Sequence, residues 1–176
     1  LELGGNNAVI VMDDANLDLA LPAILFAAVG TAGQRCTSLR RLIVHRAVHD
    51  TLVARLRSAY ASIRIGDPLA DGVLMGPLVD ESAVHDMLAA LEQARSEGAE
   101  ILAGGERLDR QGNFVLPTLV KAHQGLKIAE QETFAPILYV YAVDSLEEAI
   151  EVQNSVPQGL SSSIFTTNLL SAETFL

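Results

Sequence analysis

The sequence predicts an α/β domain built as three layers, with an open, mainly parallel sheet and helices on both faces. Two observations predict it. Short apolar runs, nearly continuous in apolar character as buried strands are, alternate with segments of helical period. The connections are short, and no repeat, low-complexity tract or linker divides the chain. Alternating strands and helices of this kind are typical of a parallel sheet, so we expect one domain over residues 1–176.

Strands are expected where the apolar runs are short and rich in β-formers. These runs are Ala8–Met12, Leu42–His45, Glu100–Ala103, Phe114–Ala122, Ile137–Val143 and Ser161–Thr166.

Helices are expected between these runs, where apolar residues recur at helical spacing. Val48–Ile63 and Val84–Leu91 show this spacing, and Gly98 then stands where a C′ glycine would close the second helix. Leu17–Val29 is apolar on almost every side and predicts a buried helix, with Pro22 near its first turn. Ser145–Glu148 opens a further helix with the spacing of a capping box.

Composition excludes several classes of protein. The chain is 49% hydrophobic and 19% charged, which excludes general disorder, and no apolar run approaches the roughly 18 residues that span a bilayer. Twelve Lys and Arg against 22 Asp and Glu give a net charge of −10, which repels nucleic acid and anionic lipid, so we expect neither as a partner. A single cysteine allows no internal disulfide. A reducing compartment fits, and we expect a cytoplasmic protein.

The chain begins at Leu1 without an initiator methionine and stops at Leu176 in what reads as the middle of a helix. We therefore expect a fragment of a longer protein.

The one thiol, Cys36, lies in a glycine-led loop, Gly33–Thr37, close to Arg35, Arg40 and Arg41. An ordinary thiol is only about 3% thiolate at pH 7, and neighbouring positive charge raises that fraction. The loop therefore suits a nucleophile, although an inert buried cysteine explains the local sequence equally well.

Two acidic motifs are candidates for chemistry. In Glu2-Leu3-Gly4-Gly5 a carboxylate precedes two glycines, which allow a tight turn or the close approach of a ligand. In Glu132–Pro136 (ETFAP) the acid could hold a ribose diol while the aromatic ring flanks a planar group. Taken alone, each motif is better explained as an ordinary loop.

A metal site and a phosphate-binding loop are not expected. His45 and His49 are four residues apart, but Arg46 stands where a zinc protease needs Glu, and His45 ends a predicted strand. The chain contains neither GxGxxG nor GxxxxGK[ST].

In identity, order and spacing, these motifs resemble the aldehyde dehydrogenase superfamily. The resemblance is carried by LELGGNN at 1–7, by AGQRCT at 32–37 with its Cys 34 residues after Glu2, and by ETFAP. It extends over essentially the whole chain, including IGDP at 65–68 and GPLVD at 76–80.

Some details depart from the usual family pattern and indicate a branch. Ala135 replaces the glycine of Phe-Gly-Pro, and Asn6 replaces the lysine that usually follows Glu-Leu-Gly-Gly. With TAGQRCT and GLSSSIF, these departures resemble the antiquitin-like branch, which oxidises α-aminoadipic semialdehyde, in equilibrium with piperideine-6-carboxylate.

The resemblance implies roles for individual residues. Cys36 would be the catalytic nucleophile and Glu2 the general base. Glu132 would hold the nicotinamide ribose, with Phe134 beside the nicotinamide and Gly4 also at the cofactor. We expect Glu2 and Cys36 to share one cavity, roughly 5–7 Å apart so that one water can bridge them.

Arg35 is the candidate substrate-binding residue. It adjoins the nucleophile, and its planar guanidinium matches the carboxylate that the branch's aldehyde carries at its far end. The alternative is that Arg35 only favours the thiolate or pairs with a surface acid.

The resemblance also implies what else the full-length protein contains. A nucleotide-binding domain would precede this catalytic segment, and an oligomerisation arm would complete it, so we expect a homo-oligomer. The cofactor is expected to be NAD, with NADP left open, and the partner a small aldehyde. Two other classes stay open: a cysteine hydrolase or acyltransferase that uses Cys36 with a histidine, and a catalytically silent interaction domain.

Overall fold

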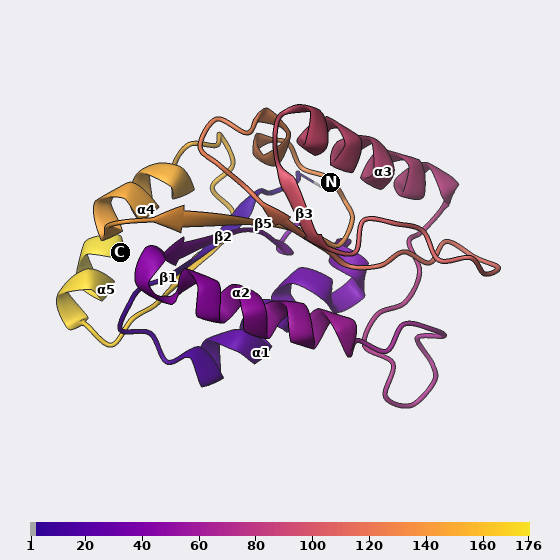
Figure 1. The fold of residues 1–176 in the computed structure, drawn as a ribbon, viewed down its shortest axis with the longest axis horizontal. Coiled ribbons are helices and arrows are strands. Elements are labelled where there is room, and N and C mark those ends of the chain that lie inside the picture. Colours follow the sequence, from indigo (N-terminus) through magenta and orange to yellow (C-terminus); the bar gives the residue numbers. More distant parts are fainter. Residues whose placement is uncertain (1–2) are drawn as a thin grey trace.

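The computed structural model describes residues 3–176, and within them six strands form one sheet in the order β3-β4-β5-β2-β1-β6 (Figure 1). Every neighbouring pair is parallel except β3 and β4. The strands are β1 (Asn7–Val11), β2 (Leu39–His45), β3 (Glu100–Ala103), β4 (Thr118–Lys121), β5 (Ile137–Val143) and β6 (Ser162–Phe165).

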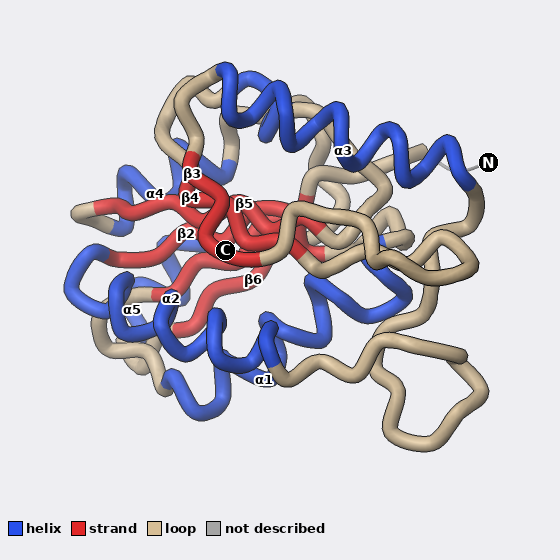
Figure 2. Tube along the Cα trace, turned by 45° about the vertical axis from the view of Figure 1, so that its right-hand side comes forward, coloured by secondary structure: helices blue, strands red, loops and turns tan. Residues whose placement is uncertain are grey.

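Helices cover both faces of this sheet. Helices α1 (Leu17–Val29) and α2 (Arg46–Ala61) lie together on one face, and α3 (Glu81–Ser96) and α4 (Leu146–Gln153) lie on the other (Figures 1 and 2). Helix α5 (Leu169–Phe175) follows β6, and two short 3-10 turns are η1 (Gly30–Gly33) and η2 (Lys127–Glu130). The predicted three-layer α/β fold is confirmed. No helix within 3–176 is both long and apolar enough to span a membrane.

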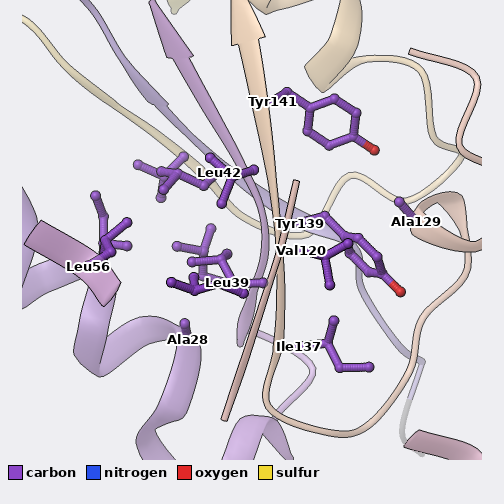
Figure 3. Packing of buried hydrophobic residues seen from close by; sticks show 14 of the residues in the cluster. Ala28, Leu39, Leu42, Leu56, Val120, Ala129, Ile137, Tyr139 and Tyr141 are labelled. Atoms are coloured by element: carbon purple, nitrogen blue, oxygen red, sulfur yellow. The ribbon is translucent and has the colours of Figure 1, made fainter. Parts of the chain in front are cut away.

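The core fills the space between the sheet and the helices on each face. Figure 3 shows Tyr139 and Tyr141 of β5 on the same side as Ala129, while Leu42 of β2 and Leu56 of α2 lie on the opposite side. Both leucines are fully buried, and each contributes about 2 kcal/mol by leaving water. The two packed faces hold the strands in register.

Several predicted boundaries were wrong for identifiable reasons. Strand β4 begins at Thr118 instead of Phe114, because Pro117 has no N–H for the ladder; only an isolated bridge joins Val115 to Arg107. Pro22 lies inside α1, near its first turn as expected.

Helix α1 is also less buried than expected. Leu19 is 63% exposed and Phe26 58% exposed on its outer face. The helix is apolar on almost every side, but only one face of it is buried.

The caps were predicted correctly. Gly98 follows the C-cap of α3 with φ +91°, and the Ser145 hydroxyl accepts a hydrogen bond from the Glu148 N–H at the start of α4.

Strand β2 begins three residues earlier than predicted and carries a bulge. Asn7 of β1 pairs with Leu39, but the next residue, Ala8, pairs with Arg41, so Arg40 is the extra residue. A bulge sends two successive side chains to one face of a sheet and is rare between parallel strands. Arg40 and Arg41 consequently both lie on the face that carries Tyr139 and Tyr141, and both are buried.

The parallel arrangement decides where the candidate motifs meet. Strands β5, β2, β1 and β6 run in the same direction, so the segments that precede them converge at one edge of the sheet. Gly4–Asn6 precede β1, the Cys36 loop precedes β2, and the Glu132 loop precedes β5. We call this the amino edge.

Candidate active site

The turn η1, which leads into the thiol loop, contains a strained stretch of backbone. Thr31 (φ 56°) and Ala32 (φ 53°) adopt the left-handed conformation that residues with a side chain rarely take, and Gly33 follows at φ 70°. Such strain costs on the order of 1–3 kcal/mol per residue and is concentrated at functional sites. The loop then turns tightly, with the Ser38 N–H donating to the Arg35 carbonyl at 3.0 Å, and leaves Cys36 half-buried.

Asn7, the first residue of β1, holds this loop in place. Its Nδ2 donates to the Cys36 carbonyl at 2.6 Å and to the Ser38 carbonyl at 2.9 Å. Its Oδ1 accepts hydrogen bonds from the backbone N–H and the hydroxyl of Ser161, at 3.1 and 2.8 Å. One buried amide thus joins the segments that precede β2 and β6.

Glycines allow the neighbouring segments to approach the loop closely. A Cβ atom on Gly5 would collide with the Cys36 carbonyl oxygen, and one on Gly33 would collide with the Ala135 carbonyl. The Gly5 contact brings the glycine pair against the thiol loop, and the Gly33 contact brings the thiol loop against the Glu132 loop. Both contacts need a residue without a side chain.

Arg40 connects the thiol loop to the Glu132 loop. Its Nη2 donates to Glu132 Oε1 at 3.1 Å and to the Arg35 carbonyl at 3.2 Å, and its Nη1 donates to the Thr133 carbonyl at 2.6 Å. The guanidinium carbon also lies 5.2 Å from the centre of the Phe134 ring, within the range of a cation–π contact. The side chain is only 3% exposed.

The charges around Arg40 compensate its burial in part. Burial lowers the pKa of Arg40, while the nearby charges of Glu132 and, less strongly, Cys36 raise it. The guanidinium stays charged at any physiological pH. By reciprocity, the attraction between Arg40 and Cys36 favours the thiolate over the thiol.

Glu132 is partly accessible beside Gly4 and a groove. Its side chain is 18% exposed, and a Cβ on Gly4, at φ 74°, would collide with Glu132 Oε2. A groove of about 370 Å³ lies between this loop and α3. It is lined on one side by Glu132 and Phe134, and on the other by Asp86 and Gln93. The site can therefore offer a nucleophile, a carboxylate and an aromatic ring at one edge of the sheet.

Comparison with known proteins identifies the family. The model of the aldehyde dehydrogenase family matches residues 1–176. The chain belongs to the aldehyde dehydrogenase family.

Its relatives at about 50% identity belong to one branch and are longer than this chain. The chain is 53% identical over 171 residues to mouse α-aminoadipic semialdehyde dehydrogenase, covering 96% of this chain and 32% of the mouse protein. Among solved structures, lactaldehyde dehydrogenase of Escherichia coli is 39% identical with a TM-score of 0.96, over 99% of this chain and 37% of that one. Betaine aldehyde dehydrogenase of Staphylococcus aureus, solved with NAD+, is 29% identical with a TM-score of 0.96, over 99% and 36%. This aldehyde dehydrogenase chain thus spans about a third of the length of its relatives.

Of the predicted site residues, one lies outside the described part. Glu2 precedes residue 3, so its distance from Cys36 stays a prediction. The two glycines of the same motif do lie at the site, Gly4 against Glu132 and Gly5 against Cys36. Glu132 and Phe134 lie together, joined to the thiol loop by Arg40.

Arg35 lies on the other side of the thiol loop, toward α1. Its guanidinium carbon is 5.3 Å from the centre of the Phe26 ring, and its buried Nε has no hydrogen-bond partner among the described residues. The arginine–carboxylate ion pairs within residues 3–176 involve other arginines, namely Arg40, Arg46, Arg55, Arg95 and Arg107.

The histidines are all engaged away from the thiol. His45 ends β2, about 20 Å along the strand from the loop that precedes it, and bonds the Asp144 carbonyl. His49 pairs with Asp50 in α2, His85 is an exposed residue of α3, and His123 bonds the Glu97 carbonyl. Residues 3–176 contain no group of three or more His, Cys, Asp or Glu that could hold a metal ion.

Sequence reasoning missed the roles of Asn7 and Arg40. Two adjacent arginines in an otherwise apolar strand were the available signal for Arg40, because a buried charge needs specific partners. Asn7 gave no signal, since nothing in its neighbourhood indicates partners 29 and 154 residues away.

Proposed function

We propose that the full-length protein oxidises an aldehyde to a carboxylic acid with NAD or NADP as hydride acceptor, through a thiohemiacetal and a thioester on Cys36. The observation that carries this proposal is the joining of the Cys36 loop to the Glu132–Phe134 loop at the amino edge, by Arg40 and by the Gly33 contact. The hydride has to pass from the aldehyde carbon bound to Cys36 to the nucleotide held by Glu132. These two residues must therefore lie side by side.

The residues present fit a nicotinamide nucleotide. Oε1 of Glu132 is paired with Arg40, while the ribose hydroxyls would donate to the carboxylate beside Gly4, where no side chain intrudes. Phe134 offers a partly exposed ring for the flat nicotinamide. When bound, the cofactor supplies the hydride acceptor.

Cys36 begins the reaction by adding its thiolate to the aldehyde carbon. The carbonyl oxygen becomes an oxyanion, which we expect the Cys36 backbone N–H to stabilise, and one such donor contributes roughly 3–4 kcal/mol. Loss of hydride from this carbon leaves a thioester on Cys36. Asn7 and Arg40 hold the backbone of the thiol loop in place.

Glu2 completes the reaction in this proposal. It takes a proton from water, the resulting hydroxide attacks the thioester carbon, and the Cys36 thiolate leaves as the acid forms.

The proposed substrate is α-aminoadipic semialdehyde. The relatives that are about 50% identical to this chain include proteins named α-aminoadipic semialdehyde dehydrogenase. Arg35 also stands next to Cys36 and forms no ion pair with a carboxylate within the described residues. A fixed guanidinium there would bind the far carboxylate of this aldehyde. We also propose a cytoplasmic homo-oligomer. The hydrolase alternative needs a histidine as base for Cys36, whereas His45 and His123 bond the carbonyls of Asp144 and Glu97.

Two substitutions in the full-length protein test this mechanism. Cys36→Ser should abolish NADH production, because a serine hydroxyl is not ionised at neutral pH. Glu2→Gln should still give one NADH per site in the first turnover and then slow by about 10²–10⁴-fold, since only thioester hydrolysis needs the base. Stopped-flow absorbance at 340 nm separates the two phases.

The matched control is Thr37→Ser, at the exposed residue next to the thiol, which should leave both phases unchanged. Steady turnover by Cys36→Ser would refute covalent catalysis by this residue. An equal loss of both phases in Glu2→Gln would refute its assignment as the hydrolytic base.

A further inference from the structure

Two adjacent buried arginines differ in the partners that they hold. Arg41 donates to backbone carbonyls of Val152 and Gln153, at 2.7 and 3.0 Å, and to Asn6. Arg40 also donates to backbone carbonyls, but it alone of the two forms an ion pair, with Glu132. Both are 97% or more buried.

The partners of Arg40 come from two loops that have to cooperate. Gly33 and Arg35 belong to the thiol loop, and their carbonyls accept at 3.3 and 3.2 Å. Glu132 and Thr133 belong to the proposed cofactor loop, and the Phe134 ring lies against the same guanidinium. The guanidinium is rigid and planar, so donors that bond both loops at once also fix the spacing between them.

The bulge in β2 is what makes this arrangement possible. Regular alternation along the strand would send Arg40 and Arg41 to opposite faces of the sheet. Because Arg40 is the extra residue of the bulge, it shares a face with Arg41 and reaches the loop before β5. A bulge next to a site re-aims a side chain in this way.

We propose that Arg40 is a positioning residue that holds the Glu132 carboxylate and the Phe134 ring at a fixed distance from the Cys36 loop, a role that rests on the proposed function. By binding Oε1 of Glu132, Arg40 also fixes which carboxylate oxygen is turned toward Gly4. The distance between the nucleotide site and the nucleophile is therefore fixed by a side chain that contacts neither the aldehyde nor the hydride.

The experiment compares substitutions of the two arginines in the full-length protein. Calorimetric titration with NAD measures the dissociation constant for Arg40→Met, Arg40→Lys, Arg41→Met and Arg41→Lys. Arg40→Met should weaken NAD binding by about tenfold or more, because a charge-assisted bond that orients Glu132 is lost. Arg40→Lys should recover part of that loss, since it keeps the charge but not the fork. The Arg41 variants should change NAD binding less than about twofold, although they disturb an equally buried site.

A second measurement does not depend on nucleotide. The rate of Cys36 alkylation by iodoacetamide, followed against pH, should move to higher pH in Arg40→Met because a positive charge near the thiolate is lost. The profile of Arg41→Met should stay that of the wild type. A general loosening of the fold would affect both variants alike.

A double-substitution cycle tests the link to Glu132 directly. Glu132→Gln should weaken NAD binding, and in the Arg40→Met background it should add little, because Arg40 acts through that carboxylate. Additive losses, or equal effects of the Arg40 and Arg41 variants, would overturn the positioning role.

Failure of the proposed function gives a different result. A wild-type protein that binds NAD but oxidises no aldehyde would refute the proposed function. The role of Arg40 would still be tested by the NAD dissociation constants of its variants. A wild-type protein that binds neither NAD nor NADP would overturn both.

Discussion

At the scale of single residues, the amino edge is held together by side chains that reach across the sheet. The Asn7 amide joins segments 29 and 154 residues away, and Arg40 joins a carboxylate 92 residues away. Each is buried, so each bond is made in a low dielectric where a lost partner is costly. A substitution at Asn7 or Arg40 should therefore disturb every segment that its side chain joins.

Gly33→Ala should destabilise the protein and lower its activity. Position 33 combines a φ of 70° with a Cβ position that overlaps the Ala135 carbonyl, so the substitution forces the thiol loop away from the Glu132 loop. Gly125→Ala is the matched control, because it has a φ of 87° but open space around its Cβ. Gly125→Ala should cost only the backbone strain of about 1–2 kcal/mol.

The measurement is the thermal midpoint and kcat of each full-length variant. Gly33→Ala should show the larger fall in both. Equal midpoints for the two variants would mean that the contact with Ala135 yields without cost.

Arg35→Ala should change substrate preference. If Arg35 binds the far carboxylate, kcat/KM for α-aminoadipic semialdehyde should fall by about 2–4 kcal/mol of transition-state binding, the value of one or two charge-assisted bonds. A neutral aldehyde of similar length should be nearly unaffected. Steady-state kinetics with both substrates decide the matter, because equal losses would mean that Arg35 serves the thiol or its stacking on Phe26 instead.

Sequence motifs identified the candidate site residues but not the residues that hold them in place. Cys36, Glu132 and Phe134 could be named in advance because their motifs, in order and spacing, resemble those of a known family. Asn7 and Arg40 could not, because their partners are set by the order of the strands, which the spacing of a single sequence does not reveal.

At the scale of elements, local chemistry predicted the helix ends better than the strand ends. Caps depend on one residue and its neighbours, and so Gly98 and Ser145 were placed correctly. Strand β2 was predicted to start too late, because two arginines look like a loop until their buried partners are known.

Asn16→Ala tests one element apart from the site. The Asn16 side chain caps α1 by accepting from the N–H groups of Asp18 and Leu19, at 3.0 and 3.2 Å. Its loss should cost about 1 kcal/mol of stability. The alkylation rate of Cys36 should not change, because Asn7 and Arg40 hold the loop at the far end of α1.

Thermal denaturation and iodoacetamide kinetics of the full-length variant provide the check, with Asn16→Ser as the control that keeps the cap. A slower alkylation in Asn16→Ala alone would show that the start of α1 is coupled to the thiol.

At the scale of the whole molecule, the position of the site is unusual for its architecture. Ligands of open α/β sheets commonly bind beyond the carboxyl ends of the strands. Here the candidate residues precede β1, β2 and β5 and so gather at the amino edge. Composition and periodicity predicted the layers correctly, but they could not predict which edge would carry the site, because both edges of a parallel sheet have the same pattern of apolar runs.

The isolated chain of residues 1–176 should fold around its own sheet yet remain inactive and associate. It leaves apolar side chains exposed on α1, at Leu19 and Phe26, and on α5, at Leu169 and Leu170. Such surface drives association when nothing covers it, even at a net charge of −10. Light scattering should show oligomers, and Leu169→Lys with Leu170→Lys should reduce their size without changing the circular dichroism.

No NADH should form from any aldehyde, because this chain spans about a third of its relatives and the resemblance assigns nucleotide binding to a preceding domain. A monodisperse monomer would mean that these side chains do not drive association, and turnover with NAD would show that the 176 residues suffice for catalysis.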